Sequence, residues 1–106
     1  MQRITQYVEE EKIYLNVDCK LSDLSLALDE KERQISNCIK EYQNCSFAQY
    51  INRYRIDFAQ QLLLSNPDKK IAEIWTYSGF ATEQSFFRAF KSVTGMTPSE
   101  WRERQQ

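Results

Sequence analysis

Two triplets of polar residues recur at the same spacing in this chain of 106 residues. Each combines an amide side chain, an arginine and a lysine at positions i, i+4 and i+7, which lie on one face of a helix. The first triplet is Arg33, Asn37 and Lys40, and the second is Gln84, Arg88 and Lys91. Arg can hold guanine through two hydrogen bonds, Asn or Gln can do the same for adenine, and Lys suits phosphate. One such triplet is more often a solvated helix face, but two in register favour contact with DNA.

The composition argues against catalytic and metal chemistry. The sequence has no histidine, which removes the commonest general base and the commonest metal ligand. Its two glycines cannot form a glycine-rich phosphate loop. Cys19, Cys38 and Cys45 lack CxxC spacing, which predicts free thiols rather than a zinc site or a disulfide framework. We therefore expect no enzyme, no cofactor and no metal.

The net charge of −1 and the pI near 5.5 argue, taken alone, against a nucleic-acid partner. The sum hides two unlike regions. Residues 1–32 carry four basic and eight acidic residues, whereas the remainder carries ten basic and seven acidic ones. Because binding depends on the local field, the total does not exclude DNA. The acidic excess predicts modest non-specific affinity and a weaker contribution from the first part of the chain.

Apolar residues recur at helical spacing and period-two runs are absent, so we predict an all-α fold. The predicted helices span residues 2–12, 21–28, 31–42, 46–65, 70–78 and 83–93, and a last one begins at Pro98. Despite its helical pattern, the segment 1–20 is expected to be the end of a connection to an upstream domain.

Several helix ends carry sharp local signals. Ser46 and Thr97 each have the form of an N-cap with Gln or Glu three residues later, which is the capping-box pattern. Thr82 is a further candidate N-cap, and Gly79 is expected to end the fifth helix in a left-handed conformation.

The chain contains an internal repeat. A shift of 51 residues places the helix 31–42 on the helix 83–93, and Asn44 on Gly95. Both helices carry an apolar stripe, formed by Ile35, Cys38, Ile39 and Tyr42 in one and by Phe86, Ala89, Phe90 and Val93 in the other. Each copy is a short helix, a tight turn and a second helix, which predicts two helix-turn-helix motifs.

We divide the chain into a first subdomain (1–45), a linker helix (46–65) and a second subdomain (66–106). A linker of about 20 residues spans roughly 30 Å at 1.5 Å per residue. Successive major-groove faces on one side of B-DNA lie about 34 Å apart. The linker is therefore long enough to hold two recognition helices in adjacent groove turns.

Residues 71–102 resemble the C-terminal signature of the AraC/XylS family of transcriptional regulators. The matching residues include Ile71-Ala72-Glu73-Ile74, Gly79-Phe80, Phe90-Lys91 and Thr97-Pro98-Ser99-Glu100. The first half matches more loosely, and the resemblance covers about residues 14–103. It implies two helix-turn-helix subdomains joined by a linker helix, with the second helix of each motif in the major groove.

The resemblance also implies which residues contact DNA. The base-reading positions are Glu32, Arg33, Ser36 and Asn37 in the first motif, and Glu83, Gln84, Phe87 and Arg88 in the second. The expected phosphate contacts are Lys40, Arg55, Thr82 and Lys91. Two roles stay open: Phe87 either touches a thymine methyl or packs against its neighbours, and Arg55 either reaches phosphate or braces the two subdomains.

The chain departs from the family pattern at three positions. Asp29 stands where the first turn usually has glycine, and Lys31 stands where the first recognition helix usually has a Ser cap. Asp29 is an alternative cap, which would shift the start of that helix. Trp75 replaces a small residue and is expected in the core or against the linker helix. We therefore expect weaker DNA contacts from the first motif than from the second.

These observations predict a sequence-specific regulator of transcription that binds double-stranded DNA. The alternative is a helical protein-interaction adaptor with degraded DNA binding, which the acidic pI and the altered first turn suggest. Expected further partners are RNA polymerase or an upstream effector or signalling domain of a longer chain. No apolar run approaches the roughly 18 residues that span a membrane. We expect no membrane contact and a location in the bacterial cytoplasm.

Overall fold

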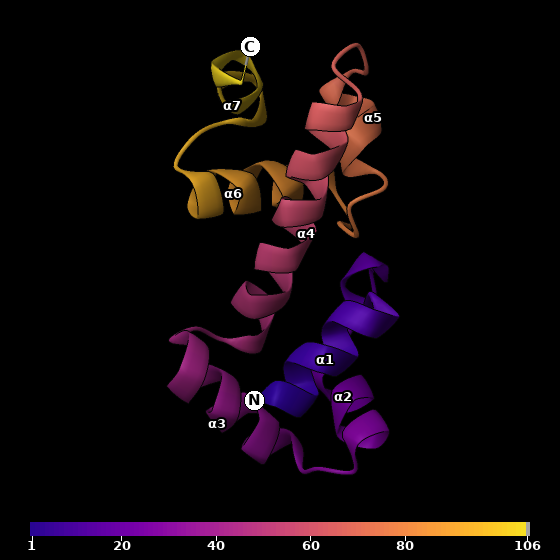
Figure 1. Ribbon diagram of the computed structural model, residues 1–106, viewed down its shortest axis with the longest axis vertical. Helices are drawn as coiled ribbons and strands as arrows, with labels where there is room; N and C mark the ends of the chain where they lie inside the picture. Colours follow the sequence, from indigo (N-terminus) through magenta and orange to yellow (C-terminus); the bar gives the residue numbers. More distant parts are fainter. Residues whose placement is uncertain (106) are drawn as a thin grey trace. The chain divides into compact units, whose positions relative to one another are not determined.

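The computed structural model describes residues 1–105, and in that part of the chain every regular element is a helix (Figure 1). The elements are α1 (Gln2–Glu11), the 3-10 helix η1 (Ile13–Leu15), α2 (Leu21–Leu28), α3 (Glu32–Gln43), α4 (Phe47–Ser65), α5 (Ile71–Trp75), α6 (Glu83–Thr94) and α7 (Pro98–Arg104). The all-α prediction is confirmed.

The chain forms two compact units. The N-terminal unit is Met1–Ile51, and the C-terminal unit runs from Asn52 through the rest of the described chain. The division falls inside α4, so the first turn of this helix belongs to one unit and the remainder to the other. Each unit has buried apolar residues of its own.

The N-terminal unit is built from α1, η1, α2, α3 and the start of α4. The side chains of Ile4 and Val8 on α1 are buried, and α1 contacts both η1 and α2. The hydroxyls of Thr5 and Tyr50 lie 3.4 Å apart, which also joins α1 to α4. Helix α1 is therefore a packed part of the N-terminal unit, and a connection from this segment to an upstream domain stays a prediction.

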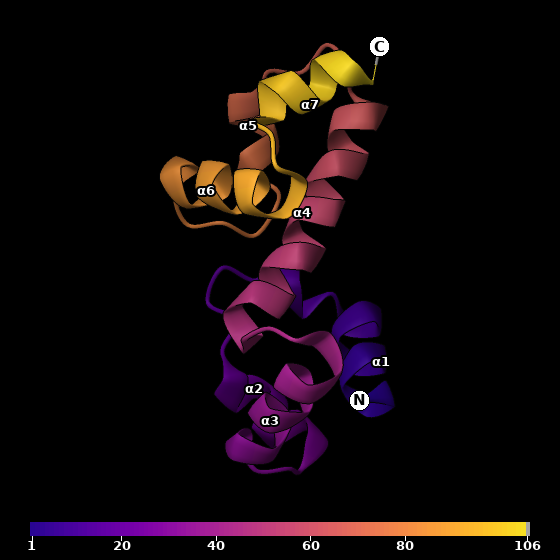
Figure 2. The same ribbon diagram turned by 90° about the vertical axis from the view of Figure 1, so that its left-hand side faces the viewer.

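The C-terminal unit has an aromatic core. Figures 1 and 2 show α5 and α6 beside the C-terminal part of α4. The buried residues are Ile56, Ala59, Leu63, Ile74, Phe80, Phe86, Ala89 and Phe90. The rings of Phe80 and Phe86 meet edge to face, with centroids 5.6 Å apart. Trp75 was expected either in the core or against the linker helix. It is half-buried against this cluster, and because the cluster includes residues of α4, both descriptions apply.

The repeat is confirmed at the ends of the two long motif helices. Asn44 ends α3 with φ 54°, and Gly95 ends α6 with φ 79°. The Asn44 amide donates to the carbonyl of Lys40 at 3.0 Å, and the Gly95 amide donates to the carbonyl of Lys91 at 2.8 Å. Both are left-handed helix ends, the conformation that Gly and Asn adopt at least cost.

Both capping boxes are confirmed, again in register. The Ser46 amide donates to Gln49 Oε1 at 2.9 Å, and the Gln49 amide donates back to Ser46 Oγ at 3.2 Å. The Thr97 amide donates to Glu100 Oε1 at 3.0 Å, and the Glu100 amide donates back to Thr97 Oγ1 at 3.2 Å. Each box satisfies two amides at a helix start that would otherwise lack partners.

Helix α5 is shorter than the predicted span 70–78. It ends at Trp75, and the chain then tightens into turns up to Gly79, whose φ is 85°. The Thr76 hydroxyl donates to the carbonyl of Glu73 at 2.8 Å, and the buried Ser78 hydroxyl donates to the carbonyl of Ile74 at 3.0 Å. The amides of Tyr77 and Ser78 bond three residues back, to Ile74 and Trp75, so the chain continues as tight turns rather than as α-helix.

The predicted apolar stripes end one position early. Tyr42 is 65% exposed and Val93 is 44% exposed, although both were expected on the buried face. Each lies near the C-terminal end of its helix, α3 or α6. The i+7 position of both stripes is therefore surface rather than core.

Candidate nucleic-acid interface

Helix α3 presents one polar face because its other face is buried. Ile35 and Ile39 are 2% and 0% exposed. The predicted contact residues that lie exposed on the same helix are Glu32, Arg33, Asn37 and Lys40, and Ser36 is half-buried beside them. The structure thus gathers the first predicted set on one helix of the N-terminal unit.

The structure does not use Asp29 as the N-terminal cap of α3, which was the alternative that the sequence offered. Asp29 is the C-terminal cap of α2, with φ 53° and ψ 47°, and its amide donates to the carbonyl of Ser25. Lys31 is the extended residue that precedes α3, and its side chain makes no capping hydrogen bond. The Asp29 cap for α3 is therefore wrong, because Asp29 closes the preceding helix instead.

Helix α6 presents the second set. Phe86 and Phe90 are fully buried, whereas Glu83, Gln84, Arg88 and Lys91 are exposed. Thr82 caps this helix: its Oγ1 accepts from the Ser85 amide at 3.1 Å and donates to Ser85 Oγ at 2.9 Å. The Thr82 cap is confirmed, and a phosphate contact by this exposed residue stays a prediction.

Phe87 is partly packed and partly open. Its ring lies 5.7 Å from the ring of Phe86, and the residue is 36% exposed. It lines an open surface hollow together with Arg88, Lys91, Ser92 and Thr97. Its apolar ring can meet a thymine methyl, while Lys91 in the same hollow can meet a phosphate.

Arg55 lies within the C-terminal unit. Its guanidinium carbon is 5.6 Å from the centre of the Phe80 ring, a cation–π contact with a core side chain. Its Nη1 donates to Asn52 Oδ1 at 3.3 Å. Arg55 therefore stabilises its own unit, and its role at phosphate stays a prediction.

Sequence reasoning missed two contacts near the motifs. Arg3 of α1 reaches the turn between α2 and α3, where it pairs with Glu30. Lys69 lies 5.8 Å from the ring centre of the exposed Tyr77, in the turn before α6. Neither pair belongs to a periodic pattern. Arg3 and Glu30 are 27 positions apart in the sequence, so no local signal joins them.

Electrostatics link α6 to α7. The pKa of Glu100 is lowered, first by the hydrogen bonds that its carboxylate receives from Thr97 and further by the nearby charges of Lys91 and Arg104.

Within residues 1–105, no group of three His, Cys, Asp or Glu side chains is placed to hold a metal ion. No described helix is long and apolar enough to cross a membrane.

Two copies of a helix-turn-helix, each presenting a polar second helix, define the class as a helix-turn-helix DNA-binding domain. Residues 24–104 match a family model described as "Helix-turn-helix domain". The chain belongs to the AraC family of helix-turn-helix transcriptional regulators and is a DNA-binding domain rather than an enzyme.

Relatives and solved structures agree with this assignment. The chain is 30% identical over 102 residues to an HTH-type transcriptional regulator of Staphylococcus aureus, which covers 96% of this chain and 13% of that protein. It is 35% identical over 82 residues to the HTH-type regulator YisR of Bacillus subtilis, covering 77% of this chain and 28% of YisR. The chain thus spans a small part of these relatives.

Two similar structures are C-terminal domains of response regulators. The C-terminal domain of AraT from Geobacillus stearothermophilus has a TM-score of 0.82 and 28% identity, with 97% of this chain and 83% of that one covered. The C-terminal domain of the response regulator yesN from Fusobacterium nucleatum has a TM-score of 0.76 and 30% identity, with 95% and 96% covered.

Proposed function

We propose that this domain binds double-stranded DNA sequence-specifically, with α3 and α6 in successive turns of the major groove. The observation that carries the proposal is the matched pair of exposed polar faces on these two helices. Helix α4 has 19 residues, or about 28 Å at 1.5 Å per residue, and successive major-groove turns lie about 34 Å apart.

The side chains divide into base-reading and phosphate-binding groups. Arg33 and Arg88 suit guanine, and Asn37 and Gln84 suit adenine. The carboxylates of Glu32 and Glu83 can accept from cytosine, and Ser36 and Phe87 complete the two base-reading sets. The phosphate contacts are assigned to Lys40, Arg55, Thr82 and Lys91.

Selection of bound duplexes from a random pool, followed by anisotropy titration, tests the proposal. Replacing Arg88 with Ala should cost about 1–3 kcal/mol on the selected site and relax base preference at one position. Arg104→Ala is the matched control, because it removes the same charge from the exposed end of α7. If the Arg88→Ala variant bound every duplex as tightly as the parent, the assignment of α6 would be wrong.

The spacing of the half-sites tests the use of two motifs. Inserting about five base pairs between them turns one half-site by half a helical turn, to the opposite side of the duplex. Since α4 is one continuous helix, we expect affinity to fall to that of a single motif. Unchanged affinity after this insertion would show that only one motif reads the DNA.

A low-salt titration with random duplex separates this function from the adaptor alternative. The acidic pI and the altered first turn are the features that suggest the adaptor. Detectable binding that weakens with salt supports the DNA function. No binding at micromolar protein favours the adaptor.

We further propose that the domain is the DNA-binding part of a longer bacterial regulator in the cytoplasm, joined to a signalling or effector domain and acting with RNA polymerase. The support is that AraT and yesN are response regulators whose C-terminal domains share this fold. Transcription from a template that carries the selected site, with purified polymerase, tests the polymerase part. An unchanged transcript level would contradict it.

A further inference from the structure

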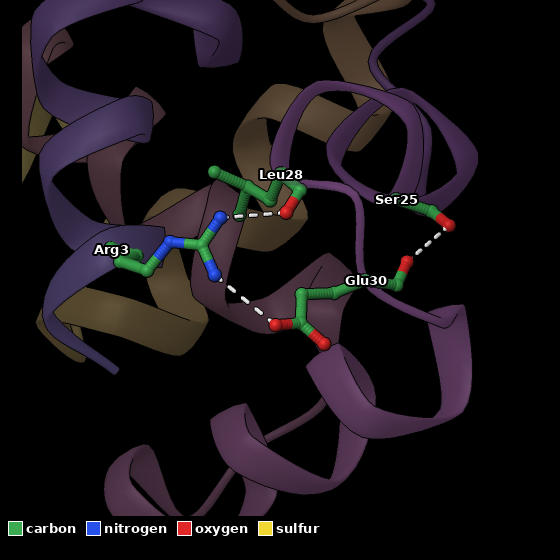
Figure 3. Close-up of polar contacts among 4 residues, drawn as sticks. All are labelled: Arg3, Ser25, Leu28 and Glu30. Atoms are coloured by element: carbon green, nitrogen blue, oxygen red, sulfur yellow. Dashed lines mark hydrogen bonds and ion pairs between the residues drawn. The ribbon is translucent and has the colours of Figure 1, made fainter.

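Arg3 of α1 holds the turn between α2 and α3 (Figure 3). Its Nη2 donates to the carbonyl oxygen of Leu28, the last residue of α2, at 2.7 Å. Its Nη1 donates to Glu30 Oε1 in the turn at 3.1 Å. One guanidinium therefore holds both the end of the first motif helix and the turn that leads to the second.

This turn has few other restraints. Asp29 is held in the left-handed region, and the side chain of Lys31 does not cap α3. The other hydrogen bonds of the turn go to Ser25, whose carbonyl accepts from the amides of Asp29 and Glu30 and whose hydroxyl donates to the carbonyl of Glu30 (Figure 3). In the second motif, the Thr82 side chain caps α6 and so restrains the turn from within the motif. In the first motif, a restraint comes instead from Arg3 of α1, outside the motif.

Arg3 also neutralises the negative charge of Glu30, which lies close to the start of α3. Glu30 lies two residues before Glu32, the first residue of the helix proposed to enter the groove. A free carboxylate near that point would repel DNA phosphates. Because the Glu30 side chain is 42% exposed and the Arg3 side chain 65%, the pair adds little to overall stability, but its charge cancels locally.

We infer that Arg3 is a positioning residue for DNA recognition by the first motif. It fixes the α2–α3 turn from outside the motif and cancels the charge of Glu30, so that contact between α3 and DNA depends on α1. This inference rests on the proposed function, yet its structural half can be tested without DNA.

Amide hydrogen exchange tests the structural half. In Arg3→Ala, exchange of the Glu30 amide should speed up about fivefold or more, because the turn loses two hydrogen bonds. The Ser85 amide in the second motif should keep its rate, and Gln6→Ala is the matched control, since Gln6 bonds to Glu10 on the same helix. A parent-like rate at Glu30 in Arg3→Ala would overturn the inference.

Footprinting on the selected duplex tests the DNA half. Arg3→Ala should bind about three- to tenfold more weakly, with protection lost at the half-site of the first motif only. Arg3→Lys should recover part of the affinity, because it restores the charge without the two-pronged contact. Equal loss at both half-sites would indicate general destabilisation and overturn the inference.

If the parent selects no duplex, the proposed function fails, while the exchange experiment still decides whether Arg3 fixes the turn.

Discussion

Four residues of the two motifs adopt a left-handed backbone, and their side chains decide what that conformation costs. Gly79 and Gly95 have φ of 85° and 79° and no Cβ to clash. Asn44 and Asp29 have φ of 54° and 53°. Asn tolerates this region, but Asp29 also places a negative charge at the C-terminal end of α2, where the helix dipole disfavours it.

Substitution of Asp29 should therefore stabilise the N-terminal unit. We expect Asp29→Asn to gain about 0.3–1 kcal/mol by removing the charge, and Asp29→Gly to gain about as much or more by also removing the Cβ. Urea denaturation gives these free energies of unfolding. Asp29→Ala keeps the Cβ and should be less stable than either, so an Ala variant above both would contradict this account.

The phosphate assignments predict changes in salt dependence. Replacing Lys40 or Lys91 with Ala should lower the slope of log affinity against log salt by about 0.9, the amount expected for one phosphate contact. Titrations at four or five salt concentrations measure the slope. Lys69→Ala is the control, since its ammonium lies over Tyr77 and not on α3 or α6. An unchanged slope in Lys91→Ala would remove that residue from the DNA contacts.

At the scale of elements, the two capping boxes differ in one respect. The box of α4 pairs Ser46 with the neutral Gln49, whereas the box of α7 pairs Thr97 with Glu100. Because the pKa of Glu100 lies below its usual value of 4.5, its carboxylate stabilises the fold above that pH. The contribution is lost as the pH falls through the lowered pKa.

Acid should therefore loosen α7 before α4. The Thr97 amide should lose its hydrogen-bonded chemical shift as pH falls below about 4.5, while the Ser46 amide keeps its shift. Glu100→Gln copies the first box and should make the shift of Thr97 independent of pH in this range. Parallel changes at Ser46 and Thr97 would mean that acid acts on the whole fold rather than on this box.

Most elements follow from local sequence signals, and the exceptions have physical causes. The bounds of α2 and the starts of α6 and α7 agree with the prediction, because apolar spacing and caps mark them. The early end of α5 does not follow from apolar periodicity, because the chain there forms tight turns in which the hydroxyls of Thr76 and Ser78 bond to carbonyls of the helix. The role of α1 is also hidden, because Arg3 finds its partners through tertiary structure.

The polar faces of the candidate interface were predictable for the same reason. An apolar stripe at helical spacing fixes the opposite face, so the exposure of Arg33 and Arg88 follows from the burial of residues such as Ile35 and Phe86. The partial packing of Phe87 does not follow, because both a core and a surface position fit its place in the sequence.

At the scale of the whole molecule, two separate cores predict separable responses to core mutations. Phe90 is fully buried in the C-terminal unit, and Phe90→Ala should cost about 3–5 kcal/mol there. A unit of this size has only a few kcal/mol of stability, so it should unfold. The NMR signals of residues 1–51 should stay dispersed while those of the C-terminal unit collapse.

Phe87→Ala is the matched control for that experiment. The same type of side chain is removed from the same helix, three residues earlier, at a position that is 36% exposed, so the loss of stability should be much smaller. Collapse of both units in Phe90→Ala would show that the chain unfolds as one cooperative body.

The paired left-handed ends and paired capping boxes mark two copies of one motif in a single polypeptide. In a homodimer, every substitution appears in both halves, and the bound site must mirror the symmetry of the protein. Here the copies have already diverged: Arg33 and Asn37 occupy the positions that Gln84 and Arg88 hold in the other copy. A substitution in one copy can change the bases that this copy prefers without changing the other copy. We therefore expect an operator whose two halves are unrelated in sequence. Such an operator has a direction, so the domain should bind it in one orientation.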